Sequence, residues 1–83
     1  MVYKSKINIT LKHGILDVQG KAVEHALHSI NFQMINNVKI GKYVELNIEA
    51  ENLENAEQIV ADACNKLIAN PIIEDFSIHI SEE

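Results

Sequence analysis

A loop passes into a helix at Leu16-Asp17-Val18-Gln19-Gly20-Lys21-Ala22-Val23. Glycine in a first helical turn costs about 1 kcal/mol relative to alanine, so another feature of the fold must offset it. Gly20 can allow a neighbouring backbone to approach closely, or it can supply an unusual backbone conformation. Alternatively, the free N–H groups at the helix end, beside Lys21, can hold an anion. The choice between these explanations decides whether the stretch is structural or a ligand site.

The residues before and after this stretch predict a strand and a helix. Alternating apolar and polar residues predict a half-buried strand over Tyr3–Leu11, which His13-Gly14 ends. The helix runs from Asp17 or Val18 to Ser29, with Asp17 as its N-cap. At 100° per residue its apolar stripe consists of Ala22, Val23, Ala26, Leu27 and Ile30. The opposite side carries Lys21, Glu24, His25 and His28.

The second half of the chain repeats this arrangement. Alternating runs at residues 37–40 and 43–50 are separated only by Gly41-Lys42, which favours an antiparallel hairpin with its tip at that dipeptide. Asn52 is the predicted N-cap of a second helix over Leu53–Asn70. Its apolar stripe consists of Ala56, Ile59, Val60, Ala63, Leu67 and Ile68. Asn70-Pro71 ends this helix because proline cannot continue the helical hydrogen bonds. The last strand is predicted around Phe76–Ile80.

The order β-α-β-β-α-β predicts an α+β, ferredoxin-like fold, with a mostly antiparallel four-stranded sheet and both helices on one face. The 83 residues are predicted to form one domain, 1–83. Such a monomer leaves one sheet face bare, with Val2, Val38 and Tyr43 on it or at its edges. A homodimer formed through the sheet face or edges is therefore expected, and neither a tetramer nor hairpin exchange between copies is decided by the sequence.

Composition excludes several classes of function. A net charge of −5 argues against nucleic-acid binding, which needs a basic face. No run approaches the roughly 18 apolar residues of a membrane span, and the N-terminus has no signal-peptide core, so a cytoplasmic location is expected. The single cysteine, Cys64, cannot form an intrachain disulfide and is interpreted as a small buried apolar residue.

No motif in the chain predicts catalysis or a metal site. His25 and His28 have a spacing that can chelate a metal, but no spacing fixes a third ligand, for which Glu24 or His13 would have to serve. Adjacent Glu74 and Asp75 point to opposite faces of a strand and cannot form a catalytic pair. The remaining carboxylates near the second helix are interpreted as a solvated face; they are Glu49, Glu51, Glu54 and Glu57. Gly41-Lys42 is too short for a phosphate-binding loop.

Four segments together resemble the PurS family. They are Leu16–Val23, Ala26-Leu27, Val38–Lys42 and Asn70–Phe76, in the same order and at compatible spacing over nearly the whole chain. The chain departs from the family pattern at three positions: Val18 replaces an expected proline, Lys39 the usual arginine, and Asn31 a common glycine. Lysine at position 39 keeps the charge but loses the planar guanidinium, so a bidentate contact there is in doubt.

The resemblance implies a function that the residues alone do not. The family is the small subunit of phosphoribosylformylglycinamidine synthase, which converts formylglycinamide ribonucleotide, glutamine and ATP in de novo purine synthesis. The resemblance implies a dimeric, non-catalytic bridge between a large synthetase subunit and a glutaminase subunit, supporting ammonia transfer between them. ATP and magnesium would bind to the large subunit, and this chain would hold no cofactor.

Residue roles follow from position and from the resemblance. The candidate contacts with partner subunits are Lys21, His25, His28, Gly41 and Lys42. The motif residues interpreted as structural are Asp17, Gly20, Asn70, Pro71, Glu74 and Asp75. The main alternative is a free-standing, dimeric, ferredoxin-like regulatory domain that binds a small ligand at its interface. A metal-dependent enzyme using His25 and His28 is a third hypothesis.

Overall fold

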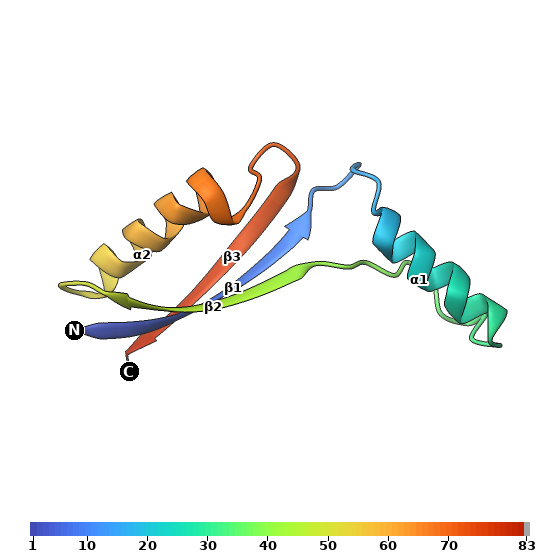
Figure 1. The fold of residues 1–83 in the computed structure, drawn as a ribbon, viewed down its shortest axis with the longest axis horizontal. Helices are drawn as coiled ribbons and strands as arrows, with labels where there is room; N and C mark the ends of the chain where they lie inside the picture. The colour runs from blue at the N-terminus through green and yellow to red at the C-terminus, as the bar shows by residue number, and fades with distance from the viewer. Residues whose placement is uncertain (83) are drawn as a thin grey trace.

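A three-stranded antiparallel sheet and two helices make up the computed structural model, which describes residues 1–82 (Figure 1). The strands are β1 (Val2–Leu11), β2 (Lys42–Glu49) and β3 (Glu74–Glu82), in the order β2-β1-β3. The helices are α1 (Val18–Ser29) and α2 (Leu53–Ala63), and a π-helical turn over Cys64–Ile68 continues α2. Among the described residues, no helix is long and apolar enough to cross a membrane.

Both helices begin at the residues that the sequence predicts. The Asp17 side chain accepts a hydrogen bond from Gly20 N–H, and the Asn52 side chain accepts one from Asn55 N–H. Each cap satisfies a donor that the first helical turn leaves without a partner in the helix itself. The two predicted N-caps are confirmed.

The hydrophobic core lies between α2 and one face of the sheet. The strand β1 alternates as predicted, and its buried residues Ile7 and Ile9 pack with Val60 and Cys64 of the α2 region. Burial raises the pKa of the Cys64 thiol, which agrees with its interpretation as a small apolar residue. The helix lies mainly over β3, so the β2 side of this face is only partly covered.

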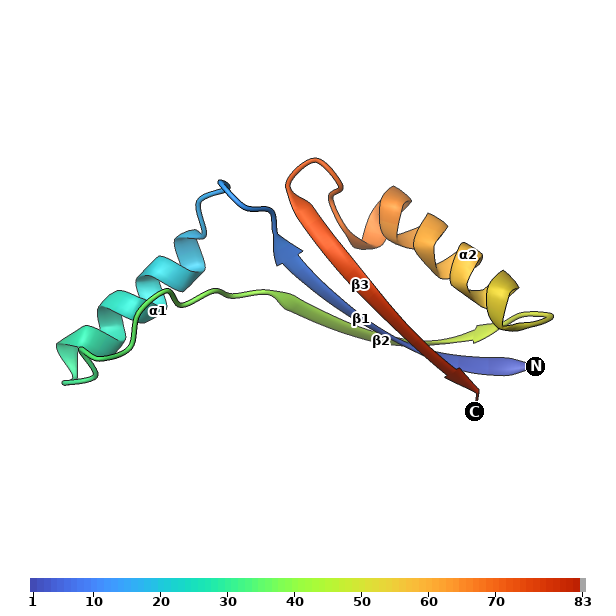
Figure 2. The same ribbon diagram turned by 180° about the vertical axis from the view of Figure 1, so that it is seen from behind.

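The predicted hairpin at Gly41-Lys42 is wrong, and the sheet has three strands instead of four. The chain continues straight from residues 37–41 into β2 (Figure 2). A two-residue hairpin turn needs positive φ, and Gly41 does not have it. Gly41 instead provides room, because a Cβ there would lie 2.6 Å from the Ile9 carbonyl oxygen.

The prediction that both helices cover one sheet face is also wrong. Residues 12–41, here called the arm, project from the sheet, and α1 lies far from α2 in both views (Figures 1 and 2). The remaining residues are called the body. The molecule is therefore elongated, measuring 51 × 26 × 14 Å along its principal axes. Among residues 1–82, the apolar stripe of α1 therefore does not pack against the sheet.

The end of α2 differs from the predicted continuous helix. Ala69 N–H donates to Cys64 O at 2.9 Å, an i to i+5 hydrogen bond that widens the turn. As a result, Leu67 leaves the apolar stripe and is 87% exposed, while Ala69 becomes buried. The structure thus corrects the predicted inward position of Leu67.

The bare face of the sheet is largely polar. Alternation along the strands places Val2 and Tyr43 on this face, among residues that include Lys4, Lys6 and Asn8. Val38, predicted to lie on the sheet, belongs to the arm instead. Two predicted apolar residues are therefore on the bare face, but most of that face is suited to water. The open outer edge of β2 is the more evident site for pairing.

Candidate functional site

Three side chains of the α1 region hold the returning segment 35–40 against the helix. Asp17 Oδ2 accepts a hydrogen bond from Ile40 N–H at 2.8 Å, and Glu24 Oε1 accepts one from Val38 N–H at 3.1 Å. His28 Nε2 donates to Ile35 O at 2.7 Å. These side chains replace a neighbouring strand along one edge of the segment. Its opposite edge remains available for strand pairing.

Gly20 lies at the closest approach between α1 and this segment. A Cβ at position 20 would overlap the Val38 carbonyl oxygen and would lie 2.5 Å from Asp17 Oδ2. The close-approach explanation of Gly20 is thus confirmed. The anionic group at this helix end is the chain's own Asp17 carboxylate, whose Oδ1 accepts from Gly20 N–H at 2.8 Å.

Hydrogen bonding lowers the pKa of both carboxyl groups in this arrangement. The N–H groups of Gly20 and then Ile40 hold the pKa of Asp17 below its ordinary value. The N–H group of Val38 does the same for the pKa of Glu24, assisted by the nearby Lys21 charge. A depressed carboxyl pKa stabilises the folded state above the ordinary pKa, and this contribution is lost as pH falls through the folded pKa.

Acidification through these lowered pKa values, below the ordinary range of carboxyl groups, is therefore expected to release residues 38–40 from α1. The measurement is a pH titration by NMR, following amide exchange at Val38 and Ile40. Their exchange should accelerate at a higher pH than the exchange of Ile7 in the core. Simultaneous loss of protection at all three amides would contradict a local role for these carboxylates.

A cleft of about 470 Å³ lies where the arm joins the body; we call it the neck cleft. It is formed by residues 10–17, residues 37–40 and the Lys21–Glu24 side of α1. Apolar side chains such as Leu11, Leu16 and Ile40 line part of it, together with Lys21 and Lys39. The cleft therefore combines apolar surface with three lysines, of which Lys12 forms an ion pair with Asp75.

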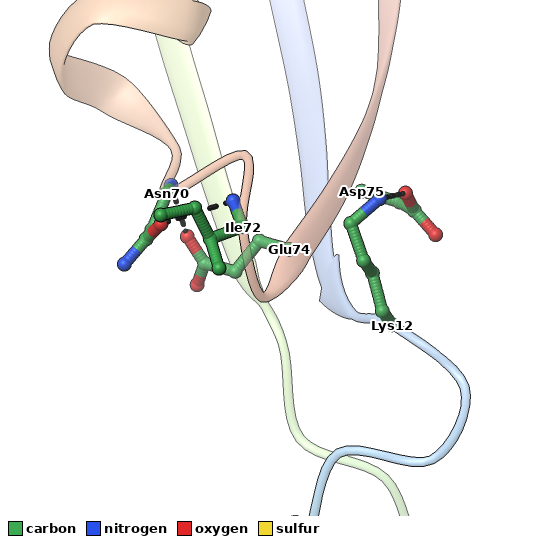
Figure 3. A network of polar contacts seen from close by, with 5 residues as sticks. All are labelled: Lys12, Asn70, Ile72, Glu74 and Asp75. Carbon is green, nitrogen blue, oxygen red and sulfur yellow. Dashed lines mark hydrogen bonds and ion pairs between the residues drawn. The ribbon is translucent and has the colours of Figure 1, made fainter.

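A polar network fixes the turn that precedes β3 (Figure 3). Glu74 Oε1 accepts from Asn70 N–H at 2.7 Å, and Asn70 Oδ1 accepts from Ile72 N–H at 3.1 Å. The hydrogen bond from Asn70 N–H lowers the pKa of Glu74, and so does the Lys42 ammonium, whose Nζ lies 3.2 Å from Glu74 Oε2. Lys12 and Asp75 form an ion pair at 2.9 Å. Asn70, Glu74 and Asp75 thus have clear structural contacts, and Pro71 lies within the same turn.

The predicted partner contacts lie in two different environments. Lys21 and His25 are exposed on α1, whereas His28 is half-buried and bonded to Ile35. Gly41 and Lys42 lie at the junction of arm and body, not at a protruding tip, because the predicted hairpin is absent. Among residues 1–82, no three His, Cys, Asp or Glu side chains gather as a metal site.

Glu24 is the site residue whose role the sequence reasoning missed. The sequence predicts only that Glu24 lies opposite the apolar stripe of the helix, whereas in the structure its side chain anchors Val38. The spacing of Asp17, Glu24 and His28 is close to a helical repeat and forms a polar stripe opposite the apolar one. That stripe is the signal for a second segment lying along the helix.

The fold and the site define a small α+β protein with a projecting arm, whose apolar helix side is left exposed by the described residues of its own chain. A family model described as PurS, phosphoribosylformylglycinamidine (FGAM) synthase, matches residues 4–82. This chain therefore belongs to the PurS family.

Individual relatives agree with this assignment. The chain is 43% identical over 81 residues to the phosphoribosylformylglycinamidine synthase subunit PurS of Bacillus subtilis, covering 98% of this chain and 95% of that protein. The solved structure of B. subtilis PurS superposes with a TM-score of 0.88 at 44% identity, covering 96% of this chain and 99% of that one. A chain in the structure of PurLQS from Thermotoga maritima gives a TM-score of 0.88 at 28% identity, covering 98% and 99%.

Proposed function

We propose that this chain is the non-catalytic small subunit of a phosphoribosylformylglycinamidine synthase and bridges its synthetase and glutaminase subunits. The observation that carries the proposal is the likeness, over almost the whole length, to a chain solved within PurLQS of T. maritima. That complex indicates association of the relative with PurL and PurQ. The match covers 99% of that chain, so nearly all of the relative has a counterpart here.

In this role the chain supports the passage of ammonia between the two larger subunits during purine biosynthesis in the cytoplasm. ATP and magnesium would bind to the synthetase subunit. This chain would contribute binding surface and the geometry of the assembly, as the match to PurS relatives supports.

We further propose that the working unit is a homodimer in which each arm lies on the body of the other copy. The first support is the sheet. The strand β2 is an edge strand, and the segment 37–40 has one edge occupied by α1 side chains and the other open. An open strand edge and an open extended segment are complementary hydrogen-bonding surfaces. Pairing them between copies would restore the fourth strand that the ferredoxin-like pattern contains.

The second support is apolar surface. Ala22 and Ala26 of the α1 stripe are exposed, Ile30 is 61% exposed, and Val18 at the start of the same side is 68% exposed. The β2 side of the core face is only partly covered by α2. Burying apolar area contributes about 25 cal/mol per Å², so covering one surface with the other favours association.

The third support is charge. The arm contains three lysines and two carboxylates, giving a net charge of +1, and it carries three of the four histidines. The body contains four lysines and ten carboxylates, giving a net charge of −6. An arm lying on the body of a second copy therefore brings opposite net charges together, whereas contact between two bodies would bring like charges together.

The test of the bridging role is reconstitution with the synthetase and glutaminase subunits of the same organism. Glutamine-dependent formation of formylglycinamidine ribonucleotide should require this chain. The reaction supplied with ammonium salt should depend on it much less, because free ammonia does not need to be transferred between subunits.

Comparing the two nitrogen sources separates bridging from a general effect on the synthetase. Equal activity with glutamine, whether or not the chain is present, would refute the proposed function. In gel filtration, the synthetase and glutaminase subunits should elute together only when this chain is present.

A further inference from the structure

We propose that the neck cleft binds a small organic anion, a phosphate or carboxylate carried on an apolar body, with Lys21 and Lys39 as its charge partners. This inference goes beyond the bridging role and does not depend on it. The volume of about 470 Å³ is within the range of small-molecule sites in proteins. Such sites combine mostly apolar walls with a few polar groups that orient the ligand.

The distribution of ion pairs identifies the charge that such a ligand would meet. Among residues 1–82, Lys4, Lys12, Lys42 and Lys66 each have a carboxylate oxygen within 4.0 Å. Lys6, Lys21 and Lys39 have no carboxylate oxygen of the described residues within this distance. Two of these three lysines line the neck cleft. On a chain of net charge −5, the neck cleft thus brings together two lysines that have no direct ion pair among the described residues.

The two carboxylates of the cleft do not take the place of a ligand. Asp17 uses both oxygens to accept backbone N–H groups, and Glu24 uses Oε1 for Val38 N–H. They hold the wall of the cleft together and reduce the local positive charge without forming ion pairs with Lys21 or Lys39 at 4.0 Å or less. Lys12 and His13 also line the cleft, and Lys12 is paired with Asp75.

The side of α1 that lines the cleft is not the apolar stripe that a second copy would cover. At 100° per residue, Lys21 and Glu24 lie on the opposite side of the helix from Ala22, Ala26 and Ile30. Residues 37–40 form one boundary of the cleft, next to that polar side of α1. Dimer formation and ligand binding therefore use different sides of α1.

The ligand must carry both an anionic and an apolar part. The ammonium groups favour a phosphate or carboxylate, because charge-assisted hydrogen bonds are about twice as strong as neutral ones. Leu11, Ile15 and Leu16 supply apolar wall on the side of the loop that follows β1. An uncharged molecule would leave the lysines without partners, and a bare ion would leave the apolar wall wet.

Phenyl phosphate is a suitable probe, and benzoate tests the carboxylate form of the same chemistry. The full chain should be titrated with each probe, following amide shifts by NMR and heat by calorimetry. Benzyl alcohol provides the apolar ring without the charge, and inorganic phosphate provides the charge without the ring. The expected shifts are saturable and concentrated in residues 10–17 and 37–40.

Lys21→Met and Lys39→Met keep the apolar stems of the lysines and remove the charges. Together they should weaken phenyl phosphate binding about tenfold or more, which corresponds to at least 1.4 kcal/mol. Lys66→Met is the matched control, because Lys66 is exposed and paired with Asp62 far from the cleft.

Three results would overturn the proposal. One is that neither anion shows saturable binding up to about 10 mM, because a specific site of this size should bind its ligand more tightly than that. Another is an equal loss of affinity in Lys66→Met. The third is binding of benzyl alcohol or inorganic phosphate alone with the affinity of phenyl phosphate.

Discussion

Gly20→Ala is expected to destabilise the protein by about 1–3 kcal/mol, although alanine is the better helix-forming residue. Helix propensity alone predicts a gain of about 1 kcal/mol from this change. The added methyl group, however, would overlap the backbone carbonyl of Val38 and crowd the Asp17 carboxylate. A backbone atom cannot move aside without shifting the segment 37–40, so the steric cost exceeds the gain in propensity.

The measurement is urea unfolding, with amide exchange at Val38 and Ile40 as a local readout. The unfolding midpoint should fall, and protection at these two amides should be lost first, because their acceptors on Glu24 and Asp17 are displaced. Gln19→Ala is the matched control, since it adds helix propensity in the same turn at an exposed position. A higher midpoint for Gly20→Ala would show that segment 37–40 does not pack closely against α1.

Ala26→Glu is expected to convert the proposed homodimer into monomers. Ala26 lies in the middle of the exposed apolar stripe of α1 and makes no contribution to the core of its own chain. A carboxylate placed there would be buried against the second copy without a partner, which raises the dissociation constant by about 100-fold or more. The apparent mass in light scattering should fall from that of two chains to the 9.3 kDa of one.

His25→Glu is the control for this substitution. It adds a carboxylate at an exposed site of the same helix, outside the apolar stripe, so the mass of the dimer should be unchanged. An unchanged mass for Ala26→Glu would refute the proposal that the arms lie on the opposite bodies. The glutamine-dependent activity of the reconstituted complex should fall with the dimer, because the bridging role is proposed for two copies.

Local signals in the sequence predicted the elements that local interactions stabilise. The caps at Asp17 and Asn52, the alternation of β1 and the buried position of Cys64 all follow from neighbouring residues. The resemblance to the PurS family was also visible in four short segments, and it is confirmed by a match over residues 4–82. The contact residues proposed for partner subunits remain predictions.

The hairpin failed as a prediction because two extended runs separated by a glycine have the same pattern whether the chain turns or continues straight. Gly41 is present for close approach to Ile9, and its φ is not positive. The predicted inward position of Leu67 failed for a related reason. The hydrogen bond from Ala69 N–H to Cys64 O changes the helical repeat near the end of the predicted apolar stripe. In both cases the deciding contact involves backbone atoms, which the residue pattern does not report.

The sequence by itself determined where both helices begin, the alternation of β1 and the family, since these depend on caps, periodicity and short motifs. Only the tertiary structure decided where the Leu16–Val23 segment leads. Gly20 and Glu24 hold a returning segment, and the resulting arm leaves its apolar side open. The physical reason is that the alternation of apolar residues specifies that a surface must be buried, whereas the path of the backbone decides which chain can bury it.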